Sequence, residues 1–398
     1  MSAHLSPVQA TPIDGSILEN REKRIVRVYE SFEDLPVAYH RLFEEAGAKS
    51  FFLGLPWYQN LVRNAFEKGD QARILGVELQ DGVSTPVAAL PVRHSQAKQG
   101  GWKLRTLSSL SNYYTSFYEP LLDPAYSREK SLQAMAQVIC AETPPWHVIN
   151  LKPLDPDSPV FSELVQSLRQ AGMIVQTYFC HGNWYYPVCG RSYKEYLESL
   201  RSSVRNIARS KNKKLERTGR ARVDITIGLH GLDSAIQAYQ EVYAASWKVP
   251  EPYTEFVPGL IRTCAEMGWL RLGVAYIDNV PAAAQVWIVS NGTASIYKIA
   301  YDQKFKELSV GSYLTMHLME RAIDVDKVRE IDYLSGDDRY KSDWMSHRRE
   351  HWGILAMNPR TLLGALAVIR HVGGRAAKQT ARRFLNAISK KIGNPSPK

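Results

Sequence analysis

The sequence contains few cysteines and no long apolar run. Among its 398 residues are 4 cysteines, and no two form the C-x-x-C pair that is typical of zinc or redox sites. No stretch reaches the roughly 18 apolar residues that a membrane-spanning helix needs. Residues 1–20 mix Pro, Ser, Gly and Asp without a continuous apolar core, so we expect no secretory signal there. These absences predict a globular protein of a reducing compartment, with a cytoplasmic location.

Acidic residues are absent after Glu350, although the whole chain carries 40 Asp and Glu against 50 Lys and Arg. Nine of those basic residues lie in 351–398, and apolar residues from Ala381 to Ile392 recur there at helical spacing. The pattern predicts a basic amphipathic tail at 358–398. Residues 360–398 then either lie on an anionic membrane surface or pack on the protein body with a solvated basic face.

Two segments about 197 residues apart resemble one another. Residues 75–89 and 272–284 each contain two β-rich runs around a tight polar turn. The turn is Asp81-Gly82 in the first segment and Asp278-Asn279 in the second, and both pairs tolerate the positive φ of a hairpin. The sequence therefore predicts a β-hairpin at each place.

The elements after each hairpin also correspond. Helical stretches are expected at 127–142 and 311–325, and apolar strands follow at 147–151 and 330–334. Two copies of one α/β unit are therefore predicted. The expected division is a flexible segment at 1–24, an N-terminal lobe at 25–185, a C-terminal lobe at 186–357 with the candidate site, and the tail at 358–398.

Residues 331–344 join an apolar strand to a charged, aromatic loop. Gly336 allows a sharp exit from the strand. The side chains beyond it can accept a proton, bind an anion or supply flat apolar surface, and they are Asp337, Asp338, Tyr340, Lys341 and Trp344. The alternative is a surface loop whose charged groups are simply solvated.

The order of strand 294–301, Gly turn 310–312, helix and strand resembles the second half of an acyl-CoA N-acyltransferase (GNAT) domain. More narrowly, Gly-Asp-Asp-x-Tyr-Lys-x-x-Trp at 336–344 resembles the end of CelD/BcsL-type acetyltransferases, which are related to the FemAB aminoacyl transferases. The resemblance covers roughly 25–355. It implies an α/β fold of tandem GNAT-like lobes with mixed central sheets, and it places a functionally important lysine at Lys341. Asp337 or Asp338 is the candidate general base, with Tyr340 beside them.

The same resemblance implies a donor site at the start of the predicted helix. Enzymes of this type bind the donor's pyrophosphate on backbone N–H groups there, which indicates Val310, Gly311, Ser312 and Tyr313. Of the usual Gly-x-Gly pattern, however, only Gly311 is present, so an ordinary helix start is the alternative. The implied donor is acetyl-CoA or another acyl-CoA, without a metal.

Aromatic and polar side chains elsewhere are candidates for the acceptor cleft. Trp247 and Tyr253 resemble the aromatic segment that lines this cleft in the family. Gln285, Tyr297 and Tyr301 are expected on neighbouring strands, where they either face the cleft or pack. Trp344 adds an aromatic surface at the end of the 336–344 motif.

Two further patterns suggest other chemistry. Residues 201–222 carry nine Lys and Arg against one Glu at helical spacing, but they have no aromatics for base stacking, so nucleic acid other than tRNA is not expected. His347 and His351 satisfy an H-x-x-E-H pattern on an assumed helix. Since no acidic residue follows Glu350, the third ligand of such a zinc site is missing.

These observations predict an N-acyltransferase that moves acetyl from acetyl-CoA to an amine of a sugar or cell-envelope precursor, either a small molecule or a lipid-linked saccharide. One alternative is a FemAB-like transferase that uses aminoacyl-tRNA on a peptidoglycan-type precursor. Another is a non-catalytic peripheral membrane adaptor in polysaccharide assembly.

Overall fold

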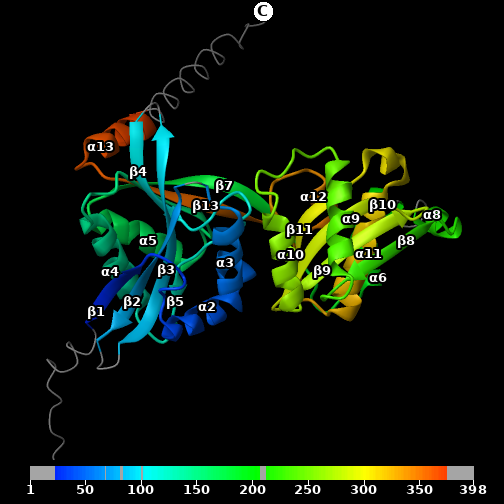
Figure 1. Ribbon diagram of the computed structural model, residues 1–398, viewed down its shortest axis with the longest axis horizontal. Coiled ribbons are helices and arrows are strands. Elements are labelled where there is room, and N and C mark those ends of the chain that lie inside the picture. Colours follow the sequence, from blue (N-terminus) through cyan, green and yellow to red (C-terminus); the bar gives the residue numbers. More distant parts are fainter. Residues whose placement is uncertain (1–22, 68, 81–83, 100–101, 207–211, 374–398) are drawn as a thin grey trace, which may run out of the picture.

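The computed structural model describes residues 23–67, 69–80, 84–99, 102–206 and 212–373. Its strands form one mixed sheet that runs through two lobes (Figure 1). Strands of the first lobe are β1 (Arg24–Tyr29), β2 (Gln71–Leu79), β3 (Thr85–Gln99), β4 (Trp102–Ser109), β5 (Leu121–Leu122), β6 (Val148–Leu154) and β7 (Ile174–Pro187). Strands of the second lobe are β8 (Ala221–Thr226), β9 (Leu270–Ile277), β10 (Val280–Ser290), β11 (Thr293–Tyr301), β12 (Glu330–Ser335) and β13 (His347–Met357).

Helices cover both faces of this sheet (Figure 1). In the first lobe they are η1 (Val37–Tyr39), α2 (His40–Gly47), η2 (Phe51–Leu53), α3 (Leu55–Asn64), α4 (Arg128–Ala141) and α5 (Pro159–Gln170). The second lobe has α6 (Tyr193–Ser199), α7 (Ser202–Asn206), α8 (Lys213–Arg217), α9 (Leu232–Ala244), α10 (Phe256–Glu266), η4 (Gln303–Leu308), α11 (Val310–Glu320), η5 (Arg321–Val325) and α12 (Lys341–Trp344). The described chain ends with α13 (Leu362–Val368) and η6 (Ile369–Gly373).

Strands β7 and β13 connect the two lobes. The sheet order is β1-β2-β3-β4-β6-β13-β7-β12-β11-β10-β9-β8, so the last strand of the chain lies between two strands of the first lobe. Strand β7 pairs with β13 along its length, and its C-terminal end also pairs with β12. The boundary placed between 185 and 186 therefore falls within a strand that belongs to both lobes.

Apolar packing joins the lobes as well. Trp57 of α3 and Phe256 of α10 are fully buried, and their ring centroids lie 5.6 Å apart in an edge-to-face contact. Such edge-to-face contacts stabilise the folded protein by more than the burial of the apolar ring surface alone. Because α3 and α10 come from different lobes, the hydrophobic core is continuous across the junction.

The predicted repeat is present. Hairpins β2–β3 and β9–β10 occupy corresponding places, and Asp278 and Asn279 have φ of 51° and 65°, as a tight hairpin turn requires. Asp81-Gly82 lies outside the described residues. The helices after the hairpins are α4 and α11, and the apolar strands after them are β6 and β12.

Two predictions of local structure are wrong. The segment 201–222 is not one helix, because α8 ends at Arg217, Gly219 adopts a φ of 65°, and β8 begins at Ala221. Residues 207–211 within it lie outside the described part. His347 and His351 lie on strand β13 instead of a helix, where pairing with β7 determines their conformation.

The tail is described only in part. The amphipathic stripe from Ala381 to Ile392 lies outside the described residues. Within the described ranges, the helices are too short or too polar to cross a lipid bilayer.

Candidate active site

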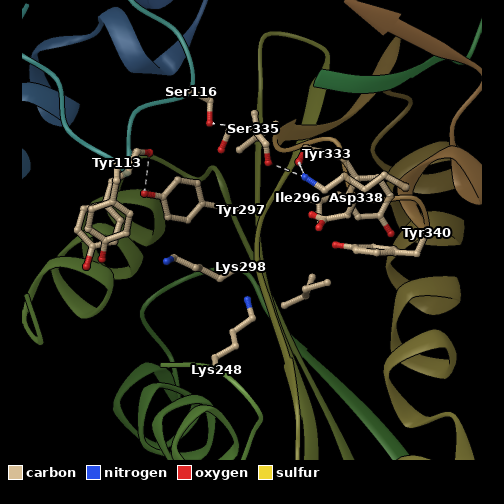
Figure 2. A pocket seen from close by; sticks show the side chains of 14 residues that line it. Tyr113, Ser116, Lys248, Ile296, Tyr297, Lys298, Tyr333, Ser335, Asp338 and Tyr340 are labelled. Carbon is tan, nitrogen blue, oxygen red and sulfur yellow. Dashed lines mark hydrogen bonds between the residues drawn. The ribbon is translucent and has the colours of Figure 1, made fainter. Parts of the chain in front are cut away.

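A cavity opens where strands β11 and β12 part. The two strands pair in parallel only between Thr293–Ser295 and Glu330–Asp332. Beyond that point they diverge and line a cavity of about 260 Å³ (Figure 2). Its wall consists of Tyr113, Tyr114, Ser116, Lys248, Ile296, Tyr297, Lys298, Ile299, Tyr333, Leu334, Ser335, Asp338, Tyr340 and Lys341. We call it the reaction cavity.

A β-bulge shapes the β11 side of this cavity. Val286 of β10 pairs with Lys298, whereas the next residue, Trp287, pairs with Ile296, so Tyr297 is an extra residue. Bulges of this kind bend a strand and re-aim its side chains near functional sites. The hydroxyl of Tyr297 donates to the carbonyl oxygen of Tyr114 at 3.2 Å, which ties the second lobe to a loop of the first.

The β12 side contains a strained turn. Leu334 has a φ of 54°, in the left-handed region that residues other than glycine rarely adopt. Its N–H donates to Asp332 Oδ1 at 2.6 Å, and its carbonyl accepts from Asn183 Nδ2 at 2.9 Å. Such strain costs about 1–3 kcal/mol and persists only where neighbouring groups enforce it. The hydrogen bonds from β7 and β12 do so here.

Lys341 holds the same turn from the other side. Its Nζ donates to the carbonyl oxygens of Tyr333 at 3.1 Å and Ser335 at 2.6 Å. Only 5% of Lys341 is exposed, so the alternative of a fully solvated loop is wrong for this residue. The helix α12 turns the chain back toward β12 and places the amino group there. Burial lowers the pKa of Lys341, against the opposing effect of Asp338.

A second lysine of the cavity is ion-paired. Lys298 Nζ lies 2.5 Å from Glu251 Oε1, while Glu251 Oε2 accepts from the hydroxyls of Tyr113 at 2.5 Å and Tyr114 at 2.7 Å. Burial alone would raise the pKa of Glu251, but Lys298 and the tyrosines lower it to about 2. Lys298 Nζ also lies 4.9 Å from the ring centroid of Tyr114, in a cation–π contact.

The third lysine is Lys248. Burial, followed by repulsion from Lys298, lowers its pKa to about 8. Within the described part of the chain, its Nζ has no hydrogen-bond or ion-pair partner closer than the ring centroids of Tyr243 and Trp247, both at 5.8 Å. Figure 2 shows Lys248 and Tyr340 reaching into the cavity from different sides. An amine of this pKa is partly neutral near neutral pH, so Lys248 can accept a proton.

The two predicted aspartates lie in different surroundings. Asp338 lines the reaction cavity. Asp337 instead forms an ion pair with Arg348 at 2.6 Å and accepts from Trp184 Nε1 at 3.0 Å. The hydrogen bond from Arg348 lowers the pKa of Asp337. Asp338 is therefore the better-placed carboxylate for chemistry in the cavity.

The predicted donor turn is the first turn of α11. Val310 and Tyr313 are buried, whereas Gly311 and Ser312 are half-buried. Gln285 is buried too, and its Nε2 donates to the carbonyl of Gly311 at 3.1 Å and to Thr315 Oγ1 at 2.7 Å. Gln285 therefore anchors the helix start from β10 and does not line the cavity.

Two predicted aromatic residues cover this helix start. A Cβ on Gly311 would lie 3.3 Å from Cδ1 of Tyr301, and the Tyr301 ring lies 4.5 Å from that of Trp247, centroid to centroid. Because Lys248 follows Trp247, this surface leads to the reaction cavity. Two other predicted aromatics lie elsewhere: Trp344 is buried in the second-lobe core, and the Tyr253 hydroxyl donates to Glu67 at 3.1 Å.

Sequence reasoning missed several lining residues. Lys248 and Lys298 lie outside the motifs described above, and Tyr113, Tyr114 and Ser116 belong to the other lobe. The run Ser-Asn-Tyr-Tyr-Thr-Ser at 111–116 is a polar, aromatic loop of the kind that binds ligands. Its approach to β12 is a tertiary contact, seen in the hydrogen bond from the Ser335 N–H to Ser116 Oγ at 3.4 Å.

The corresponding point of the first lobe is closed. Strands β4 and β6 also pair in parallel over three residues. Beyond that pair, the hydroxyls of Ser109 and Ser111 donate to the carbonyl of Lys152 at 2.6 and 2.7 Å. These bonds hold the two strands together, so the opening of the second lobe is not repeated there.

No metal centre is formed in the described ranges, where no three His, Cys, Asp or Glu side chains are grouped to hold an ion.

The chain is similar to known proteins in one matched domain and in its fold. Residues 202–342 match the acetyltransferase (GNAT) domain family. The crystal structure of FemX superposes with a TM-score of 0.55 at 11% identity, covering 83% of this chain and 96% of that one. A conserved protein of unknown function from Bacteroides thetaiotaomicron superposes with a TM-score of 0.53 at 9% identity, covering 83% and 100%. A tandem GNAT protein from the clavulanic acid biosynthesis pathway gives 0.47 at 11% identity, covering 83% and 98%.

A search of curated proteins found no match. The fold is thus α/β with tandem GNAT-like lobes, and residues 202–342 of the second lobe match the acetyltransferase domain. The protein is an acyltransferase, and most of the wall of the cavity where β11 and β12 part comes from the matched residues, with Tyr113, Tyr114 and Ser116 outside the match.

Proposed function

We propose that the protein transfers an acyl group, acetyl first, from acyl-CoA to an amine of a sugar or other cell-envelope precursor, and that the reaction occurs in the reaction cavity. One observation carries the proposal: inside the matched GNAT domain, Lys248, Lys298 and Lys341 line one cavity at the place where the sheet opens. The likeness of 336–344 to CelD/BcsL-type acetyltransferases supports a polysaccharide-related acceptor.

The start of α11 is the proposed donor site. The first N–H groups of a helix lack partners within the helix, and its dipole favours an anion. The donor's phosphates fit this helix start beside Gly311, with the acyl end directed past Tyr301 toward Lys248.

The reaction requires a neutral amine and a base. The amine nitrogen attacks the thioester carbonyl carbon, the C–S bond breaks, and the amine proton leaves as the amide forms. Lys248 in its neutral form and Asp338 are the two groups of the cavity that can take that proton. The displaced thiolate then receives a proton, so free coenzyme A departs as the thiol.

Aminoacyl transfer from tRNA is the second candidate. Arg201, the first residue of the basic segment 201–222, forms an ion pair with Asp343 of α12 at 2.9 Å. The segment thus lies beside the helix that carries Lys341. Lys and Arg in this position favour a phosphate backbone near the cavity entrance.

Ligand binding distinguishes the candidates. We expect acetyl-CoA to raise the melting temperature of the full-length protein, because a ligand that binds only the native state stabilises it. Longer acyl-CoAs and charged tRNA are the comparison ligands, with uncharged tRNA as the control for nonspecific binding. Stabilisation by charged tRNA alone would favour the second candidate. Absence of stabilisation by every donor would contradict the proposed transfer and favour the adaptor alternative.

We also propose that 360–398 attach the protein to an anionic membrane surface. Three apolar side chains of α13 and η6 are exposed: Leu362 is 75% exposed, Leu366 47% and Ile369 68%. Basic residues without any acid follow in the sequence. This arrangement suits a lipid-linked acceptor at the cytoplasmic face of a membrane.

A further inference from the structure

A second cavity, of about 310 Å³, is lined by residues of both lobes and adjoins the reaction cavity. Ser116 and Leu334 line both cavities, so they form a shared wall.

The charge of the second cavity is opposite to that of the first. Four carboxylates line it against two basic side chains. Arg349 lies 2.8 Å from Glu330 and 2.5 Å from Asp332, and these ion pairs neutralise part of the negative charge. On the other side of the shared wall, three lysines line the reaction cavity with one carboxylate.

Glu119 and Asp155 supply the remaining negative charge. Glu119 accepts a hydrogen bond from Ser158 Oγ at 2.8 Å through Oε1, and Asp155 accepts from the Asp157 N–H at 2.9 Å through Oδ1. Within the described part, no ion pair with either carboxylate is formed. Burial raises the pKa of Glu119, and Lys49 is the basic residue that opposes this effect most. Carboxylates in such a setting attract a positively charged ligand.

A buried histidine adds an unused polar group. His351 is 6% exposed and lines the second cavity, and its Nδ1 has no hydrogen-bond partner in the described part of the chain. Burial, followed by the neighbouring His181, lowers the pKa of His351 to about 3, so its ring is neutral. A buried polar atom without a partner is costly unless a ligand or water satisfies it.

We propose that this second cavity is the acceptor cavity and that it binds a primary ammonium group, which then reaches the reaction cavity past Ser116 and Leu334. The inference rests on the proposed function. Carboxylates hold the protonated amine, whereas the lysine-lined side disfavours its charge and lowers its pKa. Because the two cavities are oppositely charged, the amine becomes neutral, and therefore nucleophilic, in the reaction cavity, where the acyl group is bound.

Binding of simple amines to the full-length protein tests this inference. The probes are glucosamine and putrescine, and their neutral counterparts are glucose and 1,4-butanediol. We expect calorimetry to detect binding of both amines and of neither neutral compound. Glu119→Gln should weaken amine binding about tenfold, since it removes a charge facing the ammonium.

The matched control is Asp233→Asn, which also removes one negative charge but at an exposed site paired with Arg262. It should bind the amines as the wild type does. Acetyl-CoA binding should be unchanged in Glu119→Gln, which verifies that this variant is folded. If neither amine binds, or if Glu119→Gln binds them as tightly as the wild type, the acceptor cavity is assigned incorrectly.

The two proposals fail in different ways. If acetyl-CoA binds but amines do not, only the acceptor cavity is refuted. If amines bind and respond to Glu119→Gln but neither acyl-CoA nor charged tRNA binds, the cavity assignment stands and the proposed transfer reaction fails.

Discussion

The side chain of Lys341 both stabilises the turn at the end of β12 and lines the reaction cavity. Its amino group satisfies two carbonyl oxygens on either side of Leu334 while it lines the reaction cavity. An exposed lysine would contribute little to stability, and the sequence alone suggested such a residue. Its burial means that removal affects the fold of the β12 exit as well as the chemistry.

We therefore expect Lys341→Met to lower both stability and turnover. The substitution keeps most of the volume but leaves the carbonyls of Tyr333 and Ser335 without their donor, which costs about 1–3 kcal/mol. Denaturant unfolding and acetyl transfer measure the two effects. Lys306→Met, in η4 and outside the cavity wall, is the control and should change neither. A Lys341→Met protein with wild-type stability would show that these hydrogen bonds contribute little.

Lys248 provides a pH test. Its pKa in the folded protein is about 8, below the ordinary lysine value of 10.5. Transfer rates should rise with pH up to about 8 and then level, as neutral Lys248 becomes available. Lys248→Arg stays protonated and should lose this rise, apart from the part contributed by the acceptor amine itself. Identical pH profiles for the two proteins would exclude Lys248 as the base and leave Asp338.

The same lysine affects stability with a definite sign. Because the pKa of Lys248 is lower in the folded than in the unfolded protein, the unfolded chain binds more protons between pH 8 and 10.5. Stability from this group therefore rises with pH through that window, and its unfavourable contribution is fully present below it. Lys248→Met should remove this slope, which denaturant unfolding at several pH values measures.

Elements differ in how far the sequence predicted them. The hairpin at Asp278-Asn279, helix α11 and strand β12 follow from local turn chemistry and periodicity, and the structure confirms them. The conformation of Leu334 does not, because leucine has no preference for positive φ. It depends on Asn183, which lies 151 residues away and arrives through strand pairing.

The candidate site shows the same division. The motif 336–344 indicated Lys341, Asp338 and Tyr340, which line the cavity. The other two lysines could not be assigned from spacing, because a β-bulge at Tyr297 and the end of α9 bring them there. Periodicity predicts where a residue lies on its own helix or strand. Which residues of different elements meet in one cavity depends on the tertiary fold.

Substitutions at Gly311 of helix α11 can separate the effect of negative charge on acyl-CoA binding from the effect of steric crowding. Gly311→Asp should weaken acyl-CoA binding, because a carboxylate at an anion-binding helix start repels phosphate. Gly311→Ala is the matched control, since it brings the same Cβ to 3.3 Å from Cδ1 of Tyr301 without the charge. Calorimetry should show a much larger loss of acyl-CoA affinity for Gly311→Asp than for Gly311→Ala. Equal affinities for all three proteins would place the donor elsewhere.

At the scale of the whole molecule, the shared strands make the lobes one unit. Strand β13 pairs with β6 of the first lobe, yet it follows the helix α12 of the second-lobe site. Both cavities have walls from both lobes. Truncation before β13 should therefore disrupt both.

Membrane attachment is tested at that end of the chain. Seven of the nine basic residues after Glu350 lie in 374–398, so deleting these residues removes most of the positive charge and retains α13. Each Lys or Arg near an anionic leaflet contributes on the order of 1 kcal/mol, and the apolar side of α13 adds shallow insertion. We expect the deletion to release the protein from vesicles that contain phosphatidylserine, with acetyl-CoA binding unchanged.

Leu362→Ser with Leu366→Ser should weaken the same attachment without altering net charge, because both side chains are exposed on α13. High salt should reproduce the deletion for the wild type, since it screens the field of the lipid headgroups. Co-sedimentation with anionic and with neutral vesicles, at low and high salt, separates the two contributions. If the full-length protein binds neither kind of vesicle, α13 and the basic residues have another partner, and a lipid-linked acceptor loses its main support.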